Sequence, residues 1–115
     1  MIDAERFLEN MGGDAALCVT IIETGLKEGD GQIAHIRNLT GDSDDEATRR
    51  VLHSLRGGSG TFEASSFVRL LQAMESVCEV HGVKSILPHL AAFEAGALAY
   101  REGLLRLLEE MRTRL

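Results

Sequence analysis

The sequence predicts an all-α fold, an antiparallel four-helix bundle with a short additional N-terminal helix. Apolar residues recur at intervals of three and four along several long stretches, which is typical of helices with one buried face. No stretch alternates β-branched and polar residues in the manner of a strand, and Pro88 is the single proline. The segments between the expected helices are short, and short connections place neighbouring helices antiparallel.

Length and composition fit a single domain over residues 1–115, with 44% apolar and 26% charged residues, as in ordinary globular proteins. No apolar run approaches the roughly 20 residues needed to cross a bilayer, and the first residues lack a signal-peptide pattern, so we expect a cytoplasmic protein. The net charge of −6 argues against a nucleic-acid partner. Cys18 and Cys78 lack metal-ligand spacing and are expected to be buried free thiols.

The first two helices are predicted from their stop and cap signals. Gly12-Gly13 ends a short helix over residues 3–10, and Asp14 caps a long helix that ends within residues 38–41. Glycines inside this long helix each cost about 0.5 to 1 kcal/mol relative to alanine, so we expect bending or fraying around residues 29–31 unless tertiary contacts hold it. The expected inward positions are Phe7, Leu8, Met11, Leu17, Ile21, Leu26, Ile33 and Ile36.

The third helix is expected to begin at a capping-box pattern, Ser43-x-x-Glu46. Glycines cluster in its last turns, and the chain is expected to reverse near residues 61–63. The residues assigned to its core stripe are Ala47, Val51, Leu55, Gly58 and Phe62, with Ser54 beside them.

The last two helices are expected over residues 64–80 and from residue 85 or 88 to residue 112, with His81-Gly82 ending the first of them. Their apolar stripes are Phe67, Leu71, Met74 and Cys78, followed by Ile86, Leu90, Phe93, Ala97, Tyr100, Leu104, Leu108 and Met111. The spacing of the second stripe is typical of bundle packing.

One histidine, His53, is expected on the face of the third helix that does not contribute to the core. At about 100° per residue, His53 falls roughly opposite the apolar stripe of the third helix. Its neighbours on that face are Arg49, Arg50, Arg56, Gly57 and Gly60. An exposed nucleophile among arginines suggests phosphate chemistry.

The residue types around His53 suit transfer of a phosphoryl group. Neutral imidazole is nucleophilic near physiological pH, and a phosphoimidazole keeps a high transfer potential. Arg56, one turn on, and Arg49, one turn back, can pair with phosphoryl oxygens, while Arg50 flanks the site and adds positive potential. Gly57 leaves room for a partner to close over the imidazole.

Leu52 and Gly60 are candidate positions for docking a partner. Leu52 lies off the expected core stripe, so it either contacts a partner or packs against the end of a neighbouring helix. Ser54 and Ser59 are candidates for orienting the ring of His53. The other three histidines have no mutual spacing that suggests a metal site.

The run from His53 to Ala64 resembles the signature of histidine-containing phosphotransfer (HPt) domains of two-component phosphorelays. The residues that carry this resemblance are His53, Arg56, Gly57, Gly58, Ser59 and Ala64. Glu63 departs from the pattern, because the family usually has glycine there. The segment Phe7–Asp14 and the pattern Leu71-x-x-Met74-Glu75 also resemble the family's opening and the helix after its motif.

The resemblance implies a phosphoryl carrier without kinase activity of its own. A receiver-domain aspartyl phosphate would donate to His53, and another receiver, in a response regulator or a hybrid histidine kinase, would accept. The receiver would contribute an acidic pocket and magnesium, so no cofactor is expected on this chain. The sequence itself offers no nucleotide-binding glycine loop, metal site or general-base pair near His53.

Two other functions are compatible with the bundle, although the sequence favours the carrier. One is a non-phosphorylated adaptor that binds a receiver or kinase domain, and the retention of His53 argues against it. The other is a bundle that dimerises through exposed apolar residues, as some kinase dimerisation domains do. We expect a monomer that docks receivers through the exposed side of the third helix and adjacent parts of the second.

Overall fold

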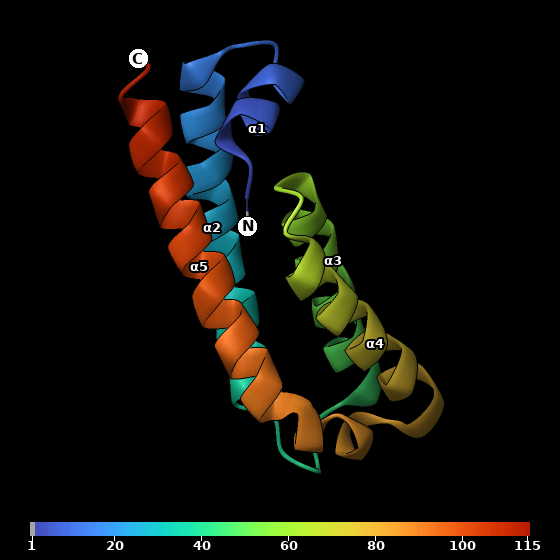
Figure 1. Ribbon diagram of the computed structural model, residues 1–115. Coiled ribbons are helices and arrows are strands. Elements are labelled where there is room, and N and C mark those ends of the chain that lie inside the picture. Colours follow the sequence, from blue (N-terminus) through green and yellow to red (C-terminus); the bar gives the residue numbers. More distant parts are fainter. Residues whose placement is uncertain (1) are drawn as a thin grey trace.

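The computed structural model describes residues 2–115 and consists of helices joined by short connections (Figure 1). The helices are α1 (Ala4–Asn10), α2 (Ala15–Arg37), α3 (Asp45–Thr61), α4 (Ser65–His81) and α5 (Leu90–Arg112), with 3-10 turns at Val83–Ser85 and Leu87–His89. No strand occurs within residues 2–115. The predicted all-α bundle with a short first helix is confirmed. None of the helices in the described range combines the length and apolar character needed to cross a membrane.

Two antiparallel helix pairs form the bundle. The α3–α4 hairpin is one pair, and the longer α2 and α5 lie side by side as the other (Figure 1). α2 also packs against α3, whereas α4 contacts α5 less extensively, and α1 packs against α2 and α5. Because α2 and α5 each have 23 residues and α3 and α4 each have 17, the molecule is elongated, with extents of 46 × 21 × 19 Å.

A chain of aromatic rings joins the elements through the core. Phe62, at the end of α3, lies 5.3 Å from Phe7 of α1 and 6.5 Å from Tyr100 of α5, between ring centroids. Phe67 of α4 stacks on Tyr100 at 5.0 Å and contacts Phe93 at 5.9 Å. These contacts hold the α3–α4 hairpin and α1 against α5.

The buried face of α3 is rotated from the predicted stripe. It consists of Thr48, Leu52, Leu55 and Ser59, whereas Gly58 is exposed. Leu52 is fully buried at 0% exposure, so its assignment as a partner-docking residue is wrong. Of the two interpretations of Leu52, packing inside the molecule is the one observed.

Two buried hydroxyl groups explain why the observed buried face of α3 differs from the predicted stripe. Thr48 Oγ1 donates to the carbonyl of Asp44 at 2.8 Å, and Ser59 Oγ donates to the carbonyl of Leu55 at 2.7 Å. Because each hydroxyl is satisfied by its own helix, both residues can be buried without an orphaned donor. A buried face predicted from apolar residues alone does not include such polar positions.

α2 is a continuous helix, and two of its three glycines, Gly25 and Gly29, face aromatic rings of the core. A Cβ at Gly25 would lie 2.7 Å from the ring of Phe62, and one at Gly29 would lie 4.0 Å from Tyr100. The expected fraying around residues 29–31 does not occur, although a Cβ at Gly31 would meet nothing within 4 Å. Leu17, expected to face inward, is 43% exposed, and its neighbour Cys18 is buried instead.

The start of α3 lies one residue later than the capping-box pattern indicates. Asp44 is the N-cap, and its carboxylate accepts from the backbone N–H of Ala47 at 2.8 Å. The hydroxyl of Ser43 instead accepts from the N–H of Thr40 at 3.0 Å. Asp and Ser cap helices about equally well, so adjacent candidates leave the boundary uncertain by one residue.

Both cysteines are free and buried, as predicted. Burial raises the pKa of the Cys18 thiol and of the Cys78 thiol, with a smaller contribution from Asp14 at the first and Asp45 at the second.

The burial of Leu52 can be measured directly. Leu52→Ala removes a fully buried side chain and is expected to lower the free energy of unfolding by about 2 to 5 kcal/mol in urea titrations. Leu98→Ala, at a position that is 61% exposed, is the matched control and is expected to change it by less than about 0.5 kcal/mol. Equal effects of the two substitutions would contradict the packing described here.

Candidate functional site

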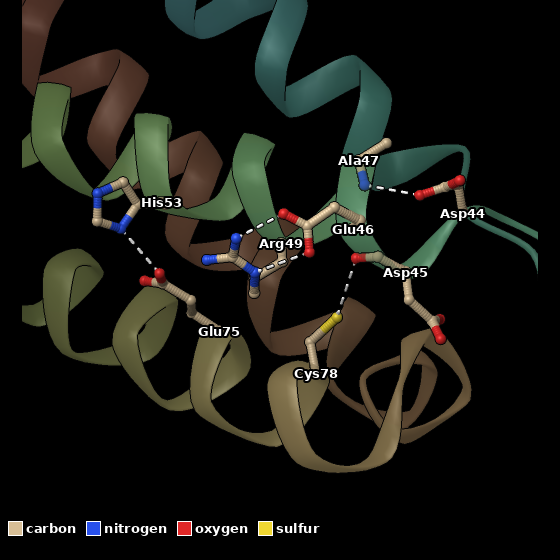
Figure 2. A network of polar contacts seen from close by, with 8 residues as sticks. All are labelled: Asp44, Asp45, Glu46, Ala47, Arg49, His53, Glu75 and Cys78. Atoms are coloured by element: carbon tan, nitrogen blue, oxygen red, sulfur yellow. Dashed lines mark hydrogen bonds and ion pairs between the residues drawn. The ribbon is translucent and has the colours of Figure 1, made fainter.

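His53 lies on the outer face of α3, and its side chain is 62% exposed. Its Nδ1 atom lies 2.8 Å from Oε1 of Glu75, which belongs to α4 and is only 13% exposed (Figure 2). The two residues meet because α3 and α4 form a hairpin, in which each lies eleven positions from Ala64. The exposed imidazole is therefore held from one side by a largely buried carboxylate.

Arg56 completes this contact. Its Nε lies 3.0 Å from Oε2 of Glu75, and its Nη2 lies 3.0 Å from Nδ1 of His53. A carboxylate only accepts hydrogen bonds and a guanidinium only donates them, so one Nδ1 atom cannot bond to both. The shorter contact, that with the carboxylate of Glu75, assigns the proton to Nδ1, and Arg56 is left with an ion pair to Glu75 in which its buried Nε has no hydrogen-bond partner.

This proton assignment leaves the other ring nitrogen, Nε2, with a free lone pair. In Figure 2, Nε2 of His53 is turned away from Glu75. A neutral imidazole with its proton fixed on one nitrogen presents the other as a nucleophile or metal ligand. Chemistry at His53 is therefore directed to Nε2.

Arg49 does not reach the imidazole. Its Nη2 lies 2.6 Å from Oε1 of Glu46 and its Nε lies 3.3 Å from Oε2, so the guanidinium donates two hydrogen bonds to that carboxylate (Figure 2). The contact lowers the pKa of Glu46 and raises that of Arg49. Arg50 is exposed and forms no ion pair within residues 2–115. Of the three predicted arginines, the structure brings only Arg56 to the ring.

The glycines after His53 are open to the surroundings. Gly57, Gly58 and Gly60 are exposed, and a Cβ on any of them would meet nothing within 4 Å. The fold therefore does not need glycine at these positions, although each costs about 0.5 to 1 kcal/mol relative to alanine. The effect is a stretch of α3 surface beside the imidazole that carries almost no side chains.

Neither serine orients the ring. Ser59 is buried and bonded to its own helix, so the proposal that it positions His53 is wrong. The hydroxyl of Ser54 accepts from Nε2 of Gln32 at 2.8 Å, which ties α3 to α2 beside the site. The residue that contacts His53 from a neighbouring helix is Glu75.

Sequence reasoning assigned no role to Glu75 or to Gln32. The signal for Glu75 was its position, since a reversal near Ala64 places residues at equal distances from it opposite one another. No comparable signal existed for Gln32, because α2 reaches α3 only through the tertiary packing.

Glu63 adopts the backbone conformation that glycine would supply in the turn. Its φ is 55°, in the left-handed region that costs a non-glycine residue about 1 kcal/mol. Its carboxylate pairs with Nε of Arg6 at 2.9 Å and so links the turn to α1. The departure from the family pattern thus leaves the α3–α4 turn with the geometry the hairpin needs.

A helical bundle with a surface histidine whose reactive nitrogen is free defines the chain as a candidate phosphohistidine carrier. The family model described as Hpt domain matches residues 20–115. The chain therefore belongs to the family of histidine-containing phosphotransfer domains. No significant match was found among curated proteins or among solved structures. Membership assigns the chain, in general terms, to histidine phosphotransfer in phosphorelays, as a phosphocarrier that interacts with receiver domains and kinases.

The proton assignment at His53 can be tested by nitrogen-15 NMR of the imidazole. The wild-type ring is expected to carry its proton on Nδ1. Glu75→Ala removes the acceptor, so the proton is expected to move toward Nε2. Glu75→Gln keeps a carbonyl oxygen in place and is expected to retain most of the Nδ1–H form. A wild-type ring protonated mainly on Nε2 would contradict the geometry.

Proposed function

We propose that His53 accepts a phosphoryl group from a receiver-domain aspartyl phosphate and passes it to another receiver, in a response regulator or a hybrid kinase. The observation that carries this proposal is the pairing of an exposed imidazole with a carboxylate that takes up Nδ1. The expected setting is a cytoplasmic monomer without kinase activity of its own. Magnesium would belong to the receiver.

The transfer requires no general base on this chain. The lone pair of His53 Nε2 attacks phosphorus, the N–P bond forms, and the P–O bond to the donor's aspartyl carboxyl group breaks. The bonding electrons leave with that carboxylate. Nε2 carries no proton to be removed, and Nδ1 keeps its proton against Glu75. The ring becomes cationic, and the negative charge of Glu75 stabilises it. Attack by a receiver aspartate on the same phosphorus reverses these steps.

The surroundings of His53 suit a partner that closes over it. Gly57 and Gly60 present no side chains, and transfer gains much of its rate from close, correctly oriented approach. The surface we assign to the receiver is the exposed side of α3 with the adjoining part of α2 around Gln32. Leu52 is inside the core and has no part in it.

Substitution of the histidine tests the proposal. Wild-type protein is expected to gain acid-labile phosphate from a phosphorylated receiver and from phosphoramidate, a small phosphoryl donor. His53→Gln is expected to lose the label from the receiver and the label that phosphoramidate places on residue 53, as followed by phosphorus-31 NMR and mass mapping. His53→Gln that still accepts phosphate from a receiver would overturn the proposal. Receiver binding without any transfer by the wild type would favour the adaptor function instead.

The open glycine surface gives a second prediction. Gly60→Leu adds a side chain two helical turns, roughly 10 Å, from His53. Transfer from a phosphorylated receiver is expected to slow by about tenfold or more, because close approach is blocked. Labelling by phosphoramidate and the urea midpoint are the controls, and neither is expected to fall. Unchanged transfer from several receivers would show that this surface lies outside the interface.

A further inference from the structure

The two nitrogens of the His53 ring point in widely different directions. Nδ1 is directed to Glu75 on the α4 side, and the bonding directions of the two ring nitrogens diverge widely. Nε2 is therefore directed away from α4, as Figure 2 shows. A phosphoryl group on Nε2 would lie on the flank of α3 that does not carry Glu75.

The three arginines of α3 divide between these flanks. At about 100° per residue, Arg49 and Arg56 fall on one side of His53 and Arg50 on the other. The contact of Arg56 with Glu75 identifies the first flank as the one that faces α4. Ser54 falls on the second flank, and its hydrogen bond to Gln32 identifies that flank as the one that faces α2. Arg50 thus lies away from the flank that carries Glu75, as Nε2 does.

The arginines also differ in whether a carboxylate already pairs with them. Glu46 holds Arg49 through two nitrogens, and Glu75 holds Arg56. The side chain of Arg50 is exposed and has neither an ion pair nor a hydrogen bond among residues 2–115. A phosphoryl group could recruit Arg50 without breaking a carboxylate contact.

The spacing of helical side chains puts Arg50 within reach of a group on His53. Residues three apart on a helix have Cβ atoms about 5 to 6 Å apart, so the long, exposed side chain of Arg50 can extend to a phosphoryl group on the imidazole. A guanidinium pairs well with two phosphoryl oxygens at once.

We propose that Arg50 is the phosphoryl-binding residue of this chain: its guanidinium pairs with the oxygens of the group on His53 Nε2, while Arg56 acts on the ring through Glu75. The proposal rests on the proposed function of His53. The three arginines then differ in role. Arg50 binds the phosphoryl group, Arg56 acts through Glu75, and Arg49 remains paired with Glu46.

The experiment compares variants of the full chain at equilibrium with phosphoramidate and ammonia. Phosphorus-31 NMR gives the ratio of phosphorylated to free His53, with His53→Gln as the background from other histidines. Arg50→Gln is expected to lower this ratio about two- to fivefold, the effect of one exposed charge pair. It is also expected to raise the pKa of the phosphoryl group. Arg50→Lys is expected to restore part of both effects.

Two control variants separate Arg50 from its neighbours. Arg69→Gln removes an exposed arginine of α4 that forms no ion pair within residues 2–115, and is expected to leave the ratio unchanged. The double substitution Glu46→Gln, Arg49→Gln removes the neighbouring pair without giving Glu46 a new hold on Arg50, and is also expected to retain the ratio. The difference between wild type and Arg50→Gln is expected to shrink in 1 M salt through charge screening.

Equal ratios in wild type and Arg50→Gln would overturn this inference, and so would a larger loss in the double variant, which would assign the role to Arg49. Both results leave His53 as the phosphorylated residue. Failure of the proposed function is distinguishable, because wild type would then carry no more label than His53→Gln.

Discussion

The burial of one face of α3 is the constraint on which the site depends. Leu52 and Leu55 are enclosed between neighbouring helices, and each fully buried leucine contributes about 1.5 to 3 kcal/mol relative to an exposed one. Turning α3 to bury His53 would expose both leucines and remove Phe62 from the aromatic cluster. The exposure of the imidazole is therefore held in place by packing on the opposite side of the helix.

Three arginines close together in sequence have become chemically different through their partners. Arg49 is held by a residue of its own helix, Arg56 by a residue of α4, and Arg50 by neither. Glu75 has the widest influence, since it binds both Arg56 and His53 and thereby sets which ring nitrogen carries the proton. The positions of these charges in the sequence do not reveal which carboxylate pairs with which arginine.

The sequence was sufficient for the helices and for the outward position of His53, because apolar periodicity reports burial directly. It was insufficient for the rotation of α3, since Thr48 and Ser59 are polar by type yet buried with their hydroxyls bonded inside the helix. It was also insufficient for the choice of partner at Arg49, where residues one turn away in either direction are in reach. Contacts between helices, such as that of Glu75, depend on register, which only the packed structure defines.

A carrier must hold a phosphoryl group without trapping it, and the charges around His53 bear on this requirement. A cluster of three unpaired guanidinium groups would stabilise the phosphorylated form strongly and so oppose onward transfer. Here Glu46 and Glu75 neutralise two of them, which leaves one exposed cation whose pairing is weak in water. Although Glu75 also stabilises the cationic ring, both carboxylates keep a guanidinium group from stabilising the phosphoryl oxygens. On this argument the acidic neighbours of the site, as much as its arginines, preserve the transfer potential that a relay needs.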